Sequence, residues 1–193
     1  QTFERQHRLL QAVQESQATF IGVEDKRQAF EGLLASFLGV TESSFGFVAE
    51  VLFDAREQPF LRMQAITDIS WDSATRKVFE AAGKRGFEFH NLDTLFGHTL
   101  RTGDTVISND PAHDPRAGGL PRGHPPLNSF LGVPISVAGK LVAMVGLANT
   151  TKAGGFDASD VAFLQPLFGT VRDLVMASRA HAERRRARLQ FET

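Results

Sequence analysis

The 193-residue sequence contains no cysteine, no tyrosine and a single tryptophan. The absence of cysteine excludes disulfides, thiolate metal sites, thiol nucleophiles and thioether attachment of a chromophore. Aromatic surface must therefore come almost entirely from the 17 phenylalanines, which we expect to serve mainly as core material. The sequence also lacks an apolar run long enough to span a bilayer and a signal-peptide pattern, so we expect no membrane insertion in this segment.

An excess of either charge is also missing. The chain has 21 basic and 22 acidic residues, which gives a net charge of −1 and predicts no nucleic-acid partner. Its 42% hydrophobic and 22% charged residues are typical of a globular protein, and the length fits one domain with appended helices. Because the chain opens at Gln1, we interpret it as a cytoplasmic segment of a longer protein.

Helical periodicity is strongest at the two ends of the chain. Residues 1–20 predict a helix with an apolar seam at alternating spacings of three and four, the pattern that pairs two helices. That seam consists of Phe3, Gln6, Leu10, Val13, Gln17 and Phe20. The alternative is a helix that lies on its own domain.

A second seam begins after Asp157, a good N-cap, and continues towards Leu189. Its members are Val161, Leu164, Phe168, Val171, Val175, Ser178 and Ala182. Pro166 predicts a bend inside this helix. The polar, arginine-rich sequence past Met176 favours pairing with a partner or continuation into another domain.

Between the terminal helices, the patterns predict one antiparallel sheet with flanking helices, an α+β fold. We expect helices at 24–38 (ended by Gly39), 73–83 and 95–101, strands at 45–53, 60–69, 104–108, 129–137 and 141–149, and a short extended piece at 87–89. In the second strand, Leu61, Met63 and Ala65 should share one face. Residues 109–127 form a long loop rich in proline and glycine, and loops of this length are usually functional.

Four stretches of the sequence carry a resemblance to a known family: SFLGVTESSFGFVAEV, LFGHTLRTGDTVISND, FLGVPISVAGKLVAMVGLAN and GGFDASDVAFLQPL. From about Asp25 to Ala177 the chain resembles a GAF domain, the small-molecule-sensing and dimerisation module of bacterial signalling proteins. The loop GLPRGHPPLNSFLGVPI resembles a subset found beside histidine-kinase, PAS and diguanylate-cyclase domains. The resemblance implies a sheet of five or six strands, terminal helices on one face and a pocket closed by loops on the other. A bilin chromophore or methionine-sulfoxide reductase activity would need cysteine, which is absent.

The candidate ligand-binding residues form two groups. An apolar group would line the pocket or fill the core: Phe47, Met63, Trp71, Phe89 and Phe130. A polar group lies in the loop: Asp110, His113, Arg116 and His124. With Asp114 it offers His and carboxylate groups without tight metal-ligand spacing, and hydrogen bonding within the loop is the alternative. Arg116 and Arg122 fit an anion, and cyclic-nucleotide binding stays open although no phosphate-loop motif occurs.

We therefore predict a sensor module without chemical turnover. It would comprise an N-terminal signalling helix (1–22), a GAF domain (23–177) and a linker helix (178–193), and would form a homodimer through its terminal helices. An unidentified small ligand would bias the loop, and the terminal helices would pass the change to an output domain of the same chain. Two alternatives remain: a dimerisation scaffold without ligand, and a metal-dependent enzyme that uses His113 and His124.

Overall fold

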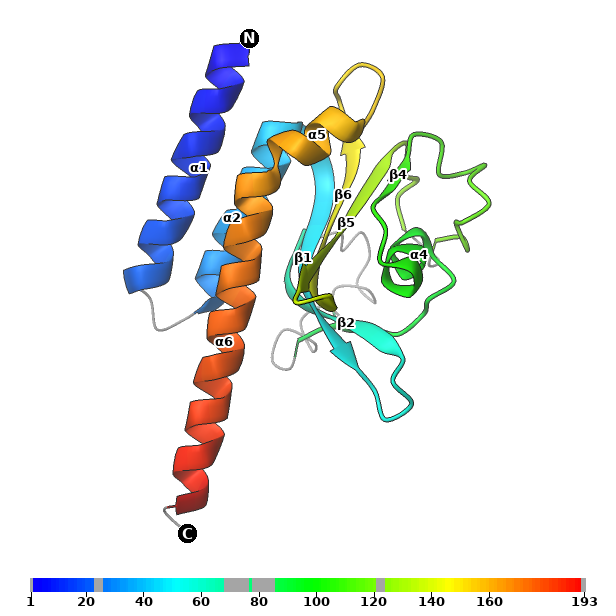
Figure 1. The fold of residues 1–193 in the computed structure, drawn as a ribbon. Helices are drawn as coiled ribbons and strands as arrows, with labels where there is room; N and C mark the ends of the chain where they lie inside the picture. Colours follow the sequence, from blue (N-terminus) through cyan, green and yellow to red (C-terminus); the bar gives the residue numbers. More distant parts are fainter. Residues whose placement is uncertain (1, 23–25, 68–76, 78–85, 121–123, 192–193) are drawn as a thin grey trace.

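The computed structural model of the protein describes residues 2–22, 26–67, 77, 86–120 and 124–191 (Figure 1). Its elements are α1 (Thr2–Gly22), α2 (Lys26–Thr41), β1 (Ser43–Phe53), β2 (Pro59–Ile66), β3 (Glu88–Phe89), α4 (Leu95–Thr102), β4 (Val106–Ser108), β5 (Phe130–Val137), β6 (Lys140–Thr150), α5 (Ala158–Phe163) and α6 (Gln165–Phe191). The helix predicted at 73–83 lies outside the described residues, except for residue 77.

The strands form one six-stranded antiparallel sheet in the order β3-β2-β1-β6-β5-β4. The predicted pairing of the last two strands is confirmed, because β5 and β6 pair from Phe130↔Ala148 to Val137↔Lys140. The central partner of β6 is β1, which comes from the first half of the chain. The α+β sheet with flanking helices that the sequence predicts is therefore present.

Helices α1, α2 and α6 form a layer on one face of this sheet (Figure 1). Between them and the sheet lies the larger core, in which the ring of Phe37 from α2 stacks on Phe168 from α6 with centroids 5.4 Å apart. Leu131 and Val145 face this core from neighbouring strands, and both are buried. Burying such side chains contributes about 1.5–3 kcal/mol each, which holds the helical layer on the sheet.

The opposite face carries α4 and the loop that follows β4 (Figure 1). Thr94 caps α4 by accepting a hydrogen bond from the Gly97 N–H, and Gly103 ends it in the left-handed conformation, at φ 75°. Leu95 and Leu100 of α4 join Met144 in a second, smaller core. The sheet thus lies between two apolar layers of different chain segments.

Two local predictions are wrong. The second helix passes through Gly39 to Thr41 and ends where Glu42 takes a positive φ of 52°, so the stop depends on a non-glycine residue. Ala65 does not share a face with Met63, because the register between β1 and β2 shifts at this point and Ala65 joins the helical side. An extra residue in one strand reverses the pleat that follows it, which simple alternation does not anticipate.

The bend predicted at Pro166 takes the form of a break between two helices. α5 ends at Phe163 and α6 begins at Gln165, so Pro166 lies in the first turn of a new helix, where no intrahelical N–H is needed. In Figure 1, α5 meets α6 at an angle. The second predicted seam packs on the molecule's own core as far as Val175, and from Ala180 to Phe191 every residue of α6 is exposed.

Helix α1 lies on the domain through a different face from the predicted seam. Leu9, Ala12 and Ser16 are buried. Phe3 and Leu10 of the seam are 80% and 62% exposed. The helix therefore rests on its own domain, as the alternative held. Of the described seam side chains, Val13 packs partly buried against the core and the others are exposed to solvent.

Candidate functional site

The loop 109–127 packs against the second core. Ala117 and Leu127 contact this core, together with Leu92 and Phe96 of the segment around the start of α4. At Gly118 a Cβ atom would lie 1.5 Å from the carbonyl oxygen of Asp93, so only glycine fits this close approach between two backbones. The loop is thus fitted to the N-terminal end of α4.

Four of the five predicted apolar residues meet in this second core. Met63 and Phe130 are buried there, and Phe47 and Phe89 are partly buried against it. The ring of Phe96 joins the last two, edge-on at 6.3 Å to Phe47 and at 6.1 Å to Phe89. The fifth residue, Trp71, lies outside the described residues. Whether this aromatic group binds a ligand or fills the core stays a prediction.

Glycines on two neighbouring strands leave the space that these rings occupy. Gly132 of β5 and Gly146 of β6 are register partners, and a Cβ at Gly146 would lie 2.3 Å from Cε1 of Phe47. The side-chain hydroxyl of Thr99 is buried beside Gly132 and has no hydrogen-bond partner. An unpaired buried hydroxyl costs about 1–3 kcal/mol, so this interior holds one polar group that a ligand could use.

The polar residues of the loop are not gathered at one point. His113 Nδ1 lies 2.9 Å from a carboxylate oxygen of Asp110, and their side chains are 83% and 69% exposed. His124 Nδ1 lies 2.7 Å from the carbonyl oxygen of Pro125. Over the described residues, no three His, Asp or Glu side chains lie close enough together to hold a metal ion.

Arg116 forms a two-point ion pair within the loop and a hydrogen bond to a neighbouring strand. Its guanidinium donates to both carboxylate oxygens of Asp114, at 2.9 and 2.7 Å, and to the Ile107 carbonyl at 2.9 Å. Hydrogen bonds from Arg116 hold the pKa of Asp114 well below its usual range, against the effect of burial, and the same pair raises the pKa of Arg116. Arg116 therefore ties the loop to β4, and Arg122 lies outside the described residues.

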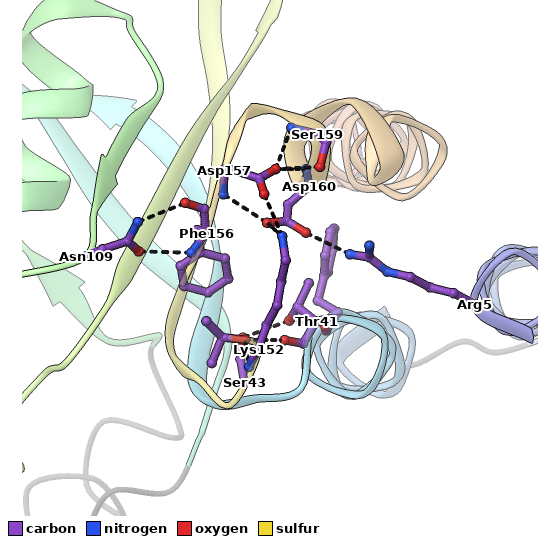
Figure 2. Close-up of polar contacts among 11 residues, drawn as sticks. Arg5, Thr41, Ser43, Asn109, Lys152, Phe156, Asp157, Ser159 and Asp160 are labelled. Atoms are coloured by element: carbon purple, nitrogen blue, oxygen red, sulfur yellow. Dashed lines mark hydrogen bonds and ion pairs between the residues drawn. The ribbon is translucent and has the colours of Figure 1, made fainter. Parts of the chain in front are cut away.

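Sequence reasoning missed a polar network where the loop begins (Figure 2). Asn109 donates from Nδ2 to the Phe156 carbonyl and accepts from the Phe156 N–H at Oδ1, both at 2.9 Å. Phe156 directly precedes Asp157, which caps α5 in a reciprocal capping box with Asp160. The sequence predicts this cap, but not the contact with Asn109, 47 residues away.

Asp160 is the charged centre of this network, and its side chain is 1% exposed. Oδ2 accepts from Lys152 Nζ at 2.8 Å, and Oδ1 accepts from Arg5 of α1 at 2.7 Å (Figure 2). Burial alone would raise the pKa of Asp160, but the hydrogen bonds from Lys152 and Arg5 outweigh it and the pKa is lowered. This carboxylate joins the first helix to the start of the last helical segment.

A second long-range contact lies where α6 leaves the domain. Arg179 donates to the Glu50 carboxylate at 2.6 Å, to the Val51 carbonyl at 2.8 Å and to the Val142 carbonyl at 3.3 Å. Val142 adjoins a register irregularity in the β5–β6 pair. Lys26 of α2 donates to the nearby Ala177 carbonyl at 3.1 Å. The exposed end of α6 is thus anchored to the sheet and to α2.

The sheet order and the helical layer agree with the family resemblance that the four quoted sequence stretches carry. The sequence matches the family model for the GAF domain over residues 6–175. The chain belongs to the GAF domain family. No curated protein matches this GAF domain in sequence.

Solved structures agree on the fold. The GAF domain of a phosphoenolpyruvate-protein phosphotransferase from Coxiella burnetii superposes with a TM-score of 0.71 at 14% identity, over 92% of this chain and 98% of its own. A free methionine-R-sulfoxide reductase from Neisseria meningitidis, in complex with its substrate, gives a TM-score of 0.64 at 14% identity, over 90% and 91% of the two chains. Part of a methyl-accepting chemotaxis protein gives 0.59 at 11% identity, over 86% and 95%. These similarities establish the GAF fold, which serves both signalling proteins and an enzyme.

The described helices include none that is both long and apolar enough to cross a membrane.

Proposed function

We propose that this GAF domain is the regulatory sensor of a cytoplasmic signal-transduction protein. It binds a small ligand between the sheet, α4 and the loop 109–127, and it forms a homodimer through α1 and α6. The change in the loop passes to an output domain of the same chain, a histidine kinase or a diguanylate cyclase. The signalling helix (1–22) and the linker helix (178–193) flank the sensor domain (23–177).

The observation that supports this proposal best is the course of α6. Up to Val175 the helix packs on the sheet, and from Ala180 onward all of its described residues are exposed. Beyond the core this helix is polar and buries none of its described residues, although helices in proteins gain most of their stability from such packing. It is placed to carry movement of the sheet to a neighbouring segment or to a second copy.

Transmission requires two states that the ligand binds with different affinity. The sheet is well placed for this, because its strands contact both the loop layer and the helical layer. Phe130 and Leu131 are neighbours on β5, and they face the second core and the larger core respectively. A ligand that displaces Phe130 would therefore shift the strand on which the helices rest.

The ligand-binding residues remain those predicted from the sequence. Phe47, Met63, Phe89 and Phe130 supply an apolar lining, to which the structure adds the hydroxyl of Thr99. An apolar interior with few polar groups suits a small, largely apolar ligand. We propose that the domain carries out no chemistry of its own; in particular, it has no cysteine for the thiol chemistry of a reductase.

The dimer is tested first. Leu10→Arg places a charge on the exposed seam of α1, and Gln11→Arg places the same charge one position further round the helix, also on an exposed residue. Sedimentation equilibrium should show that Leu10→Arg weakens self-association about tenfold or more, because a desolvated charge at an interface costs several kcal/mol. Gln11→Arg should leave it close to wild type. A monomeric wild type at high concentration would remove the dimer from the proposal.

The ligand is tested separately, by native mass spectrometry of the protein as purified from cells. A co-purified molecule that is lost in Phe130→Ala and retained in the Gln11→Arg control would support binding at this site.

The scaffold without ligand is the second candidate, and one observation favours it. Ala117 and Leu127 of the loop pack on the aromatic core, as expected of a loop that closes a filled interior. Under this alternative, the wild-type protein would dimerise while no small molecule, native or screened, changed its melting temperature.

A further inference from the structure

The segment between β6 and α5 is held from two sides by side chains from distant parts of the chain. On one side, Asn109 grips the backbone of Phe156, and on the other Arg5 reaches the buried carboxylate of Asp160 (Figure 2). Phe156 and Asp160 lie four positions apart, and the capping box of α5 joins Asp157, the residue after Phe156, to Asp160. Whatever moves Phe156 therefore moves the carboxylate that Arg5 contacts.

The two hydrogen bonds of the Asn109 side chain fix the position of the Phe156 backbone. The Asn109 amide forms a hydrogen bond with both the N–H and the carbonyl of Phe156, so it fixes the orientation of this residue as well as its distance. The neighbouring Gly155 has φ 76°, and a Cβ there would lie 2.1 Å from Asn109 Oδ1. The close approach of Asn109 to this backbone thus depends on glycine at position 155. Asn109 is also the first residue of the loop 109–127.

Docking of α1 depends strongly on its contact with Asp160. Among the described side chains of α1, the apolar part of that docking comes from Leu9 and Ala12, which are buried, and from Val13, which packs partly buried against the larger core. Near the start of the helix, Arg5 adds a charge-assisted hydrogen bond of 2.7 Å and a contact 4.3 Å above the ring of Phe163. Such hydrogen bonds are about twice as strong as neutral ones, so Arg5 should be a main determinant of whether α1 stays docked.

We propose that Asn109 controls the docking of α1, by setting the position of Phe156 and hence of Asp160. The loop that begins at Asn109 and the N-terminal helix α1 are then coupled through one short polar path. Weakening the two Asn109–Phe156 hydrogen bonds favours the undocked helix, and by reciprocity undocking of α1 weakens these hydrogen bonds. The proposal rests on the proposed function only for the idea that a ligand acts on this loop; the coupling itself is a property of the unliganded chain.

The test is hydrogen–deuterium exchange of the wild-type chain and its variants, read as the exchange rate of α1 amides relative to α2 amides. Arg5→Gln should raise this ratio roughly tenfold, the factor that corresponds to loss of a charge-assisted hydrogen bond. Asn109→Ala should raise it about threefold or more, although Asn109 does not contact α1. The matched control is Asn91→Ala, which removes another loop asparagine whose Oδ1 accepts only from the Asp93 N–H among the described contacts, and it should leave the ratio unchanged.

The double variant Arg5→Gln with Asn109→Ala distinguishes coupling from two separate effects. If the path runs through Asp160, the double variant should exchange more slowly than the product of the two single effects, because without Arg5 the position of Asp160 no longer matters to α1. An unchanged ratio in Asn109→Ala, or a fully multiplicative double variant, would overturn the proposal. An unchanged ratio in Arg5→Gln would overturn it as well.

Asn109→Asp is the second variant if Asn109→Ala destabilises the whole domain. It keeps the acceptor for the Phe156 N–H but loses the donor to the Phe156 carbonyl, so it should raise the α1 ratio while α2 exchange stays near wild type. The same measurements at two protein concentrations tenfold apart separate this proposal from the dimer. Protection of α1 that depends on concentration reports pairing of copies, whereas the Asn109 effect should be the same at both.

Discussion

At the scale of single residues, the packing of the second core requires a residue without a Cβ atom at position 146. Gly146 lies directly under the ring of Phe47, and a Cβ there would meet Cε1 at 2.3 Å and Cζ at 2.4 Å. Phe47 lies in the middle of β1, so its ring has little freedom to retreat. The packing of one aromatic ring thus fixes the residue type on the neighbouring strand.

Gly146→Ala should therefore destabilise the domain by about 1–3 kcal/mol, the usual cost of overpacking a filled core. Gly32→Ala is the matched control, because Gly32 lies on the exposed side of α2 and a Cβ there would meet no atom within 4 Å. It should stabilise the domain by about 0.5–1 kcal/mol through helix propensity. Urea unfolding of both variants measures the difference, and a Gly146→Ala variant as stable as wild type would show that Phe47 does not hold this position.

The buried carboxylate of Asp160 makes a separate, pH-dependent contribution. Its pKa is lowered in the folded protein, so it stabilises the fold above the unfolded-state value of about 3.9 and the stabilisation is lost as the pH falls through the folded value. Asp160→Asn should lose about 1–3 kcal/mol near neutral pH and should show a shallower decline in stability than wild type below about pH 4. Asp104→Asn, at an exposed aspartate, should follow the wild-type curve. Parallel curves for Asp160→Asn and wild type would contradict this account.

At the scale of elements, α6 is held to the sheet at the point where it leaves the domain. Arg179 reaches three acceptors on two strands, and the Glu50 side chain that it pairs with is only 16% exposed. No described residue of α6 beyond it is buried. Arg179 thus marks the point on α6 beyond which the helix is exposed.

Arg179→Lys tests this anchor, because lysine keeps the charge but lacks the planar fork that serves several acceptors at once. We expect a loss of about 1–2 kcal/mol in unfolding free energy and faster amide exchange from Met176 onward. Arg172→Lys is the control, at an exposed arginine of the same helix that pairs with its neighbour Asp173. Equal exchange in the two variants would mean that Arg179 does not anchor α6.

The elements themselves were largely predictable, whereas their long-range polar contacts were not. The hairpin from Phe130 to Thr150 follows from the apolar residues on either side of Gly139, and the end of α4 follows from Gly103, because both signals are local in sequence. The stop of α2 at Glu42 gave no signal, since a positive φ at glutamate is fixed by what surrounds it. Asn109 looked like any polar loop residue, because its partner is 47 positions away and is backbone.

The candidate site divides in the same way. The sequence named Phe47 and Phe130 as apolar residues of one pocket or core, and both belong to the second core, because alternation along a strand decides which face a residue takes. It could not show that Arg116 is taken up by Asp114 and the Ile107 carbonyl, because loop conformation follows no period. Thr99 was missed for another reason: nothing in a helical sequence says that its hydroxyl lacks a partner.

At the scale of the whole molecule, the two terminal helices differ in what they offer a second copy. The exposed face of α1 carries Phe3 and Leu10 among polar neighbours, whereas the exposed end of α6 carries Arg184, Arg185 and Arg186 ahead of the exposed Leu189 and Phe191. If the two copies of the proposed homodimer lie parallel, α1 supplies apolar contact and the arginines at the ends of α6 repel each other. The stability of the dimer then depends on the balance between apolar contact and charge repulsion, and salt changes the second of these.

Raising the salt concentration from about 50 mM to about 500 mM should therefore tighten the dimer, because screening shortens the range of the repulsion between arginines while apolar contacts persist. Arg185→Gln should tighten it about twofold at low salt and reduce its dependence on salt, since like charges on neighbouring helices cost a few tenths of a kcal/mol. Arg56→Gln removes an equal charge from the exposed turn between β1 and β2 and should leave the dissociation constant unchanged. Sedimentation equilibrium across the salt series measures all three proteins. A dimer that dissociates as salt rises would instead be held by ion pairs, and the arginine ends of α6 would then have to lie apart or face acidic side chains of the second copy.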